Sequence, residues 1–262
     1  MRIVLLLTIS LSLLSSALAT AADPVRLRVL CYNIHHAEGV DRQLDLDRIA
    51  RVIKSVEPDL VALQEVDQNA ARTRSIDQPA ELARLTGMHV AFGPNIELQG
   101  GHYGNAVLSR FPIKSHKNHL LPNRDNGEQR GVLVTELQVD GLAEPLVLLA
   151  THFDHRPDHR ERVASAQAIN ELVINESRPT LVAGDLNDVI ESDTLKLLQT
   201  VWQPTNNDPL ATIPVDNPTR QIDFILFKRQ QSWTAATTRV LEEATASDHR
   251  AIFAELEYRP EQ

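Results

Sequence analysis

The chain has 262 residues, a formal net charge of −9 and a single cysteine, Cys31. This length suits one large domain or two small ones, and no linker-like stretch divides it, so we expect one domain over residues 23–262. One cysteine excludes an intramolecular disulfide, and an acidic balance with five lysines disfavours tight binding of duplex nucleic acid, which depends on neutralising phosphates.

The first residues have the pattern of a secretory signal. Arg2 supplies the positive start, residues 3–14 form an apolar stretch, and Ala17-Leu18-Ala19 is a small-x-small cleavage site. We expect a signal peptide over residues 1–19, with cleavage as late as Ala22 as the second choice. The apolar stretch is shorter than the ~20 residues that span a bilayer, which disfavours an uncleaved anchor. An exported protein, periplasmic or secreted, without a stable membrane span is predicted.

Apolar runs alternate with helical patterns along the rest of the chain. Buried strands are expected at five such runs: residues 27–32, 60–63, 146–150, 180–183 and 222–227. Apolar spacing and capping residues predict four helices: residues 46–56, 77–87, 160–175 and 193–199. Closely spaced strands between residues 88 and 150 leave no room for crossover helices and should pair antiparallel, and three strands should end the chain. The expected fold is α/β (α+β), a two-layer β-sandwich of mostly antiparallel sheets flanked by helices.

Eight polar residues stand at the ends of apolar runs, inside one of them, or in a turn beside them. They are Asn33, Glu65, His152, Asp185, Asn187, Asp223, Asp248 and His249. Polar groups where buried strands end cost stability unless they have partners, so several at one edge of a sheet indicate a site. Carboxylate and amide oxygens suit Mg²⁺ or Mn²⁺ better than zinc, which prefers His and Cys. An acidic, metal-binding site is therefore predicted.

Two short segments indicate the chemistry of this site. In Gly184-Asp185-Leu186-Asn187, the two-residue period of an extended chain puts the carboxylate and the amide on one side. Such a carboxylate can orient and deprotonate a water, and the amide can bind an oxyanion. Asp223 lies among apolar neighbours and needs a partner, for which an imidazole such as His249 or His152 is suited. A plain turn motif and purely structural histidines are the alternatives.

Two further segments have more than one interpretation. The residues Thr151-His152-Phe153-Asp154-His155 partly match the zinc motif of metallo-β-lactamase-fold hydrolases, but the pattern is incomplete. The segment after Asn33 either contacts substrate or is a solvated loop, and its polar residues are His35, His36, Glu38 and Asp41.

Taken in order, three motifs resemble those of the endonuclease/exonuclease/phosphatase superfamily, the metal-dependent phosphoesterases that include deoxyribonuclease I. The motifs are Leu63-Gln64-Glu65, Gly184-Asp185-Leu186-Asn187 and Ser247-Asp248-His249. The resemblance extends over nearly all of the chain that follows the signal. It implies a deoxyribonuclease I-like sandwich with the site at one edge of the sheets.

The resemblance also implies a role for each residue of the site. Three positions correspond to ligands of Mg²⁺: Asn33, Glu65 and Asp248. Five correspond to residues that act on water, phosphate and protons: His152, Asp185, Asn187, Asp223 and His249. Two match positions that support phosphate binding: Tyr103 and Arg130.

Together these features predict an exported Mg²⁺-dependent phosphoesterase, with Mn²⁺ as a substitute. It should hydrolyse a phosphodiester, such as a phospholipid headgroup, by direct attack of water. A secreted non-specific nuclease is one alternative, and a non-catalytic secreted binding module on the same fold is another. A degenerate binding module should have lost Glu65, Asp185 or His249, and this chain keeps all three.

Overall fold

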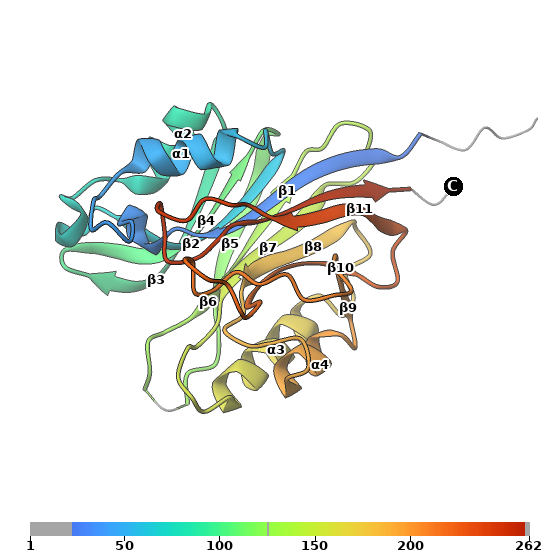
Figure 1. Ribbon diagram of the computed structural model, residues 1–262. Helices are drawn as coiled ribbons and strands as arrows, with labels where there is room; N and C mark the ends of the chain where they lie inside the picture. Colours follow the sequence, from blue (N-terminus) through green and yellow to red (C-terminus); the bar gives the residue numbers. More distant parts are fainter. Residues whose placement is uncertain (1–22, 125, 260–262) are drawn as a thin grey trace, which may run out of the picture.

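The computed structural model describes residues 23–124 and 126–259, so the predicted signal peptide lies outside the described residues. Two six-stranded sheets pack against each other in this part of the chain (Figure 1). The first has the strand order β11 (Trp233–Val240), β12 (Ile252–Tyr258), β1 (Val25–Asn33), β2 (Leu60–Gln68), β4 (Gly101–Ser109), β3 (His89–Leu98). The second has the order β5 (Ile113–Leu120), β6 (Gly131–Leu137), β7 (Leu146–His152), β8 (Thr180–Asp185), β10 (Asp223–Lys228), β9 (Trp202–Pro204).

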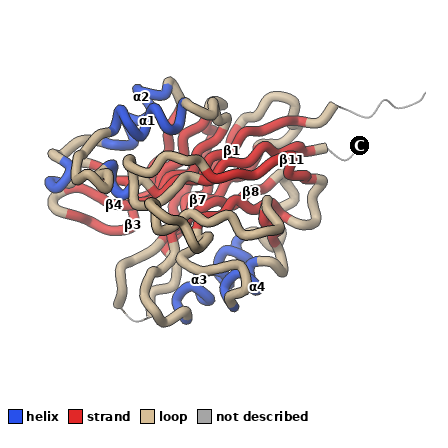
Figure 2. The backbone as a smooth tube through the Cα atoms, viewed as in Figure 1, coloured by secondary structure: helices blue, strands red, loops and turns tan. Residues whose placement is uncertain are grey.

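Helices cover the outer faces of the two sheets, as Figure 2 shows. The helices α1 (Leu46–Lys54) and α2 (Gln78–Thr86) pack on the first sheet, and α3 (Arg160–Leu172) and α4 (Asp193–Leu198) pack on the second. No helix in the described part of the chain is long and apolar enough to cross a membrane.

The apolar runs form strands that are buried on both faces. In β1, alternate residues such as Val29 and Cys31 pack between the two sheets, while Leu30 and Tyr32 pack against α1. A strand covered on both faces appears in the sequence as a continuous apolar run, which is why these runs were recognisable. The layered arrangement therefore has three apolar layers, one between the sheets and one under each pair of helices.

Pairing of the strands is mostly antiparallel, as predicted. Two pairs are parallel, β1 with β2 and β7 with β8, and each is joined through a helix, α1 or α3. The predicted two-sheet fold flanked by helices is confirmed. Because β1, β2, β7 and β8 are parallel within their pairs, the polar residues at the carboxyl end of each pair come together.

Helix boundaries follow the capping residues. Asp45 accepts a hydrogen bond from Arg48 N at 2.8 Å and begins α1, and Gly87 ends α2 in the left-handed region at φ 71°. The prediction for α3 was too long, because the chain leaves helical geometry at Val173, where φ is −110°. The carbonyl oxygen of Val173 accepts a hydrogen bond at 2.7 Å from Nζ of Lys228, the last residue of β10.

Three other predictions needed correction. Four strands follow α4, because the three-residue β9 carries too few residues to show a pattern. Asp223 is the first residue of β10 and does not lie inside it. Glu65 lies within the longer strand β2, at a bulge where the pairing with β4 shifts between Leu63 and Val66.

Gly184 is required where β8 approaches β7. A Cβ atom at this position would lie 2.2 Å from the backbone oxygen of Thr151, which cannot move without breaking the ladder. We expect Gly184→Ala to lower the free energy of unfolding by about 1–3 kcal/mol, as overpacking does in other cores. Urea unfolding measures this change. The control is Gly127→Ala, where a Cβ meets only the guanidinium end of Arg156, and equal stability of both variants would contradict the argument.

Candidate active site

An open cleft of about 330 Å³ lies where the central strands of both sheets end. Seven of the ten residues predicted for the site line it: Glu65, Tyr103, Arg130, His152, Asp185, Asn187 and His249. Two more contact these residues from behind: Asn33, which is fully buried, and Asp223, which pairs with His249. The structure thus brings together nine of the ten predicted residues.

Asp185 is at the centre of the site, in a row that crosses the second sheet. In the strand register, His152 of β7 and Asp223 of β10 lie on either side of it. Its carboxylate is buried and accepts hydrogen bonds from Asn33 Nδ2 at 3.1 Å and from Asn187 N at 2.9 Å. Burial and the neighbouring charge of Asp223 raise the pKa of Asp185 to about 7. A carboxyl group with this pKa is suited to act as a general base near neutral pH.

His249 is the cation that balances this pair of carboxylates. Its Nδ1 lies 2.9 Å from Asp223 Oδ2, and its Nε2 lies 3.7 Å from Asp185 Oδ2. Burial opposes protonation of the ring, but Asp223 and Asp185 outweigh it and raise the pKa of His249 to about 10. Ser247 holds the turn in place, because its hydroxyl donates to Asn33 O at 2.7 Å and accepts from His249 N at 3.2 Å. His249 is therefore protonated at neutral pH.

His152 is in the opposite state. Burial and the charge of Arg130 lower its pKa well below the usual value. Arg130 Nη1 lies 3.0 Å from His152 Nδ1, and a guanidinium can only donate, so Nδ1 accepts. The ring proton is then on Nε2, which lies 3.4 Å from Asp185 Oδ2, its acceptor. Asn187 Nδ2 lies 3.1 Å from the same Nε2 but is itself a donor, and it donates to Phe153 O instead. The site contains one charged and one neutral imidazole on either side of the same carboxylate.

Two residues of the cleft have backbones in the left-handed region. Glu65 has φ 57° at the bulge of β2, and Asn187 has φ 49° directly after β8. These geometries are uncommon for residues other than glycine, and they aim both side chains into the cleft instead of along their strands. Asn187 Nδ2 also donates to Phe153 O at 3.1 Å, which fixes the amide.

The predicted metal ligands are only partly assembled. Glu65 Oε1 accepts from Asn33 Nδ2 at 3.0 Å, whereas Asn33 Oδ1 accepts from His35 N at 3.0 Å. The amide nitrogen of Asn33, and not its oxygen, therefore faces Glu65 and Asp185. Asp248 is exposed and does not line the cleft, and its Oδ1 lies 3.3 Å from Ser247 Oγ, whose proton is donated to Asn33 O. Its assignment as a ligand stays a prediction.

Oxygen acceptors that could hold a cation are nonetheless present. The Glu65 carboxylate is open to the cleft, and Asp223 Oδ1 is buried without a hydrogen-bond partner. Asp223 forms a group with Asp185 and His249 whose ligand atoms lie within 4.8 Å of one another. The carboxylate oxygens of Glu65 and Asp223 fit a divalent metal that takes oxygen ligands, whereas the protonated ring of His249 cannot ligate one. The partial zinc motif does not assemble: Arg130 contacts both His152 and His155, and Asp154 pairs with Arg156.

The loop after Asn33 is half-buried at His35, His36 and Glu38 and exposed at Asp41, and none of these four residues lines the cleft. His35, His36 and Ala37 have consecutive positive φ values of 44°, 44° and 62°, a conformation that costs ~1–2 kcal/mol per residue for L-amino acids. Gln78 holds the turn by donating from Nε2 to His36 O at 2.7 Å. Burial and the charge of Arg72 lower the pKa of His36 to about 4, so its ring is neutral at physiological pH.

Sequence reasoning missed several residues that line the cleft. Arg72 makes two 2.7 Å hydrogen bonds to the buried Asp67 and lies 5.3 Å over the ring of Tyr103. Ile96 and Leu98, on the β3–β4 hairpin, form an apolar wall. No motif marks these positions in the sequence, because they reach the cleft through the length of the hairpin and the path of a loop.

Asp185→Asn is expected to stabilise the metal-free protein at pH 8. A raised folded-state pKa gives stability that is complete below the unfolded value of 3.8 and lost as the pH rises through about 7. The amide imitates the protonated acid, so the variant should be more stable by on the order of 2 kcal/mol at pH 8, and the difference should vanish toward pH 4. Denaturant unfolding in EDTA measures both. The exposed Asp140→Asn is the control, and a difference independent of pH would contradict the assignment.

Comparison with known proteins agrees with this geometry. The model of the Endonuclease/Exonuclease/phosphatase family matches residues 30–249. Uncharacterized protein YbhP of Escherichia coli strain K12 is 29% identical over 244 residues, which cover 87% of this chain and 95% of YbhP. A 5'-tyrosyl-DNA phosphodiesterase of Caenorhabditis elegans is 25% identical over 181 residues, or 66% of this chain and 46% of that protein.

Comparison with solved structures points to the same family. The crystal structure of an endonuclease/exonuclease/phosphatase from Beutenbergia cavernae superposes with a TM-score of 0.74 at 26% identity, covering 89% of this chain and 72% of that one. This likeness confirms the deoxyribonuclease I-like fold that the sequence motifs imply. Because the family match spans most of the chain, from β1 to the turn that carries His249, the protein belongs to the endonuclease/exonuclease/phosphatase family.

Proposed function

We propose that this protein is an exported, Mg²⁺-dependent phosphodiesterase that hydrolyses a small phosphodiester, such as a phospholipid headgroup, by direct attack of water. The observation that carries the proposal is the arrangement of side chains around Asp185 at the cleft. Its carboxylate Oδ2 lies 3.4 Å from His152 Nε2 and 3.7 Å from His249 Nε2, and all three residues line the cleft. Burial and the charge of Asp223 raise the pKa of Asp185 to about 7, which agrees with this arrangement. Members of the family are metal-dependent phosphoesterases, and the family match spans residues 30–249, which include all ten residues predicted for the site.

In this proposal the residues of the second sheet act on water and phosphate. Asp185 orients the attacking water and takes its proton, because its carboxylate is fixed by Asn33 and by the backbone of Asn187. The protonated His249 and Arg130 offer hydrogen bonds to the equatorial oxygens, where charge increases in the transition state. The amide of Asn187, two residues beyond the end of β8, supports the same oxygens.

Glu65 is the residue we assign to Mg²⁺. Asn33 and Asp248 are further ligands on the sequence motifs alone, because the amide of Asn33 turns its nitrogen to Glu65 and Asp248 does not line the cleft. When bound, the ion would supply Lewis-acid stabilisation of the phosphate charge. The orphaned oxygen of Asp223 and the open carboxylate of Glu65 support a cation in this region.

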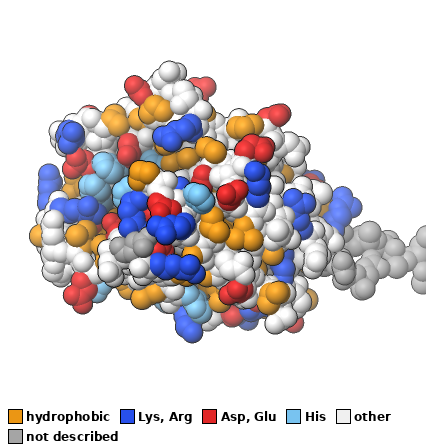
Figure 3. Space-filling model, turned by 90° about the horizontal axis from the view of Figure 1, so that it is seen from below, with side chains coloured by type: hydrophobic (Ala, Val, Ile, Leu, Met, Phe, Trp, Pro, Cys, Tyr) orange, Lys and Arg blue, Asp and Glu red, His pale blue; other side chains and the backbone are white. Residues whose placement is uncertain are grey.

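The shape and charge of the protein favour a small substrate over duplex DNA. The cleft is about 330 Å³, has an apolar wall of Ile96 and Leu98, and belongs to a chain of net charge −9. On the face drawn in Figure 3, basic side chains lie among acidic ones and do not form a continuous basic surface. A secreted non-specific nuclease remains the second candidate, because a relative is a 5'-tyrosyl-DNA phosphodiesterase.

Hydrolysis of bis-p-nitrophenyl phosphate with Mg²⁺ and with EDTA tests the activity. We expect turnover that EDTA abolishes, and a fall in kcat of ~10²–10⁴-fold in Asp185→Asn, the range typical of general acid–base catalysis. His249→Gln and Glu65→Gln should fall comparably. His116→Gln, on the exposed strand β5, is the matched control. Absence of Mg²⁺-dependent hydrolysis of any diester in a panel, or full activity of Asp185→Asn, would refute the proposal.

Two assays, hydrolysis of a glycerophosphodiester and binding of duplex DNA, separate the two candidates. We expect the glycerophosphodiester to be hydrolysed and a 20-bp duplex to bind no more tightly than ~10⁻⁴ M at physiological salt, the weak end of non-specific binding. Fluorescence anisotropy at several salt concentrations measures the duplex affinity. Rapid DNA cleavage with a steep salt dependence would instead establish the nuclease.

A further inference from the structure

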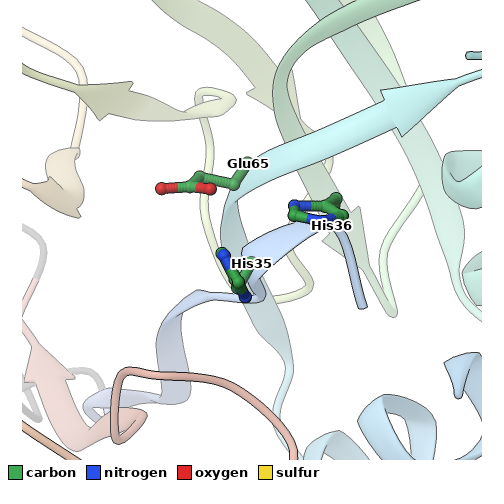
Figure 4. A group of neighbouring side chains, drawn as sticks. All are labelled: His35, His36 and Glu65. Carbon is green, nitrogen blue, oxygen red and sulfur yellow. The ribbon is translucent and has the colours of Figure 1, made fainter. Parts of the chain in front are cut away.

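Two histidines lie beside Glu65, and the proposed function uses neither. His35 and His36 belong to the 3₁₀ turn η1 (His35–Ala37), and Glu65 belongs to the bulge of β2 (Figure 4). Each of the three side chains offers one ligand atom, and these atoms all lie within 4.8 Å of one another. The three residues are half-buried, so an ion can reach them from solvent.

Each of the two rings has a nitrogen that no hydrogen bond occupies. His35 Nδ1 lies 2.9 Å from Glu38 O, which can only accept, so Nδ1 carries the proton and Nε2 has the lone pair. His36 Nδ1 is buried without a hydrogen-bond partner, and its Nε2 is 3.9 Å from Glu38 Oε2, which is too long for a hydrogen bond. His35 therefore has the arrangement of metal-binding histidines, with one nitrogen toward a carbonyl oxygen and the other available to an ion.

Charge around the group also permits a cation. Arg72 is the nearby guanidinium, and its charge, which acts on His36, is partly offset by two hydrogen bonds to the buried carboxylate of Asp67. The carboxylates of Glu65 and Glu38 remain close to the rings. The left-handed turn holds both rings at a cost that such loops rarely bear outside functional sites.

We propose that His35, His36 and Glu65 form a binding site for a divalent transition-metal ion such as Zn²⁺. Two imidazoles and one carboxylate match the preference of Zn²⁺ and Co²⁺, whereas Mg²⁺ prefers an all-oxygen set. Three protein ligands leave a position open for water or a phosphate oxygen. This inference goes beyond the proposed function. The two share only Glu65, so the metal site can exist whether or not the protein hydrolyses phosphodiesters.

Titration of the metal-stripped protein, purified without a histidine tag, with Co²⁺ tests the site through its visible absorption. We expect one Co²⁺ to bind, and Zn²⁺ to displace it. His35→Asn and His36→Asn should each weaken Co²⁺ binding by at least the ~10–100-fold that loss of a second-shell partner costs. Asparagine is the replacement because it tolerates positive φ. His116→Asn, on the exposed strand β5, should bind Co²⁺ like the unmodified protein.

A second variant distinguishes this site from the group of Asp185, Asp223 and His249. If His249→Asn loses Co²⁺ while His36→Asn keeps it, or if neither changes it, the proposal is wrong. Thermal unfolding verifies that each variant folds, and Glu38→Gln, which leaves both rings in place, provides a further test should His36→Asn fail to fold. It should also weaken Co²⁺ binding, and unchanged binding would overturn the site. If the unmodified protein binds Co²⁺ as expected but shows no Mg²⁺-dependent turnover, only the proposed function is refuted.

Discussion

The pairing of Asp185 with Asp223 across two adjacent strands is the constraint on which the rest of the site depends. Like charges directly opposite each other destabilise a sheet, and here both carboxylates are buried. His249 lies against both and supplies the compensating charge. The turn that carries His249, before β12, is joined to the end of β1 by the hydrogen bond from Ser247 Oγ to Asn33 O. His249 thus links this part of the first sheet to the second sheet.

Asn33 carries this constraint from one sheet to the other. Its amide nitrogen donates to Asp185 of the second sheet and to Glu65 of the first. The distance between the carboxylates of Asp185 and Glu65 is therefore set by the packing of the two sheets, and not by a flexible loop. Such a site is built on rigid elements, because the neighbours of the two residues with positive φ are buried under the helices: Leu63 and Val66 beside Glu65, and Leu186 beside Asn187.

Much of this arrangement was predictable because it depends on local signals. Continuous apolar runs identified the central strands, and Asp45, Asp77 and Gly87 marked helix ends. The order of motifs selected nine residues that do converge. Contacts between distant segments left no such signal: the bulge that turns Glu65, the left-handed turn at His35–Ala37, and the pairing of Arg72 with Asp67 all arise from packing. For the same reason the exposure of Asp248 could not be read from its motif.

The two imidazoles show how environment, and not residue type, assigns chemistry. Both rings are buried, and burial alone favours the neutral form in each. His152 faces Arg130 and stays neutral, whereas His249 faces two carboxylates and becomes charged. In the proposed reaction Asp185 is then an available base beside a ring that already carries a proton for the phosphate. Because His249⁺ also limits how far the pKa of Asp185 can rise, the balance that permits two buried acids keeps the base active near neutral pH.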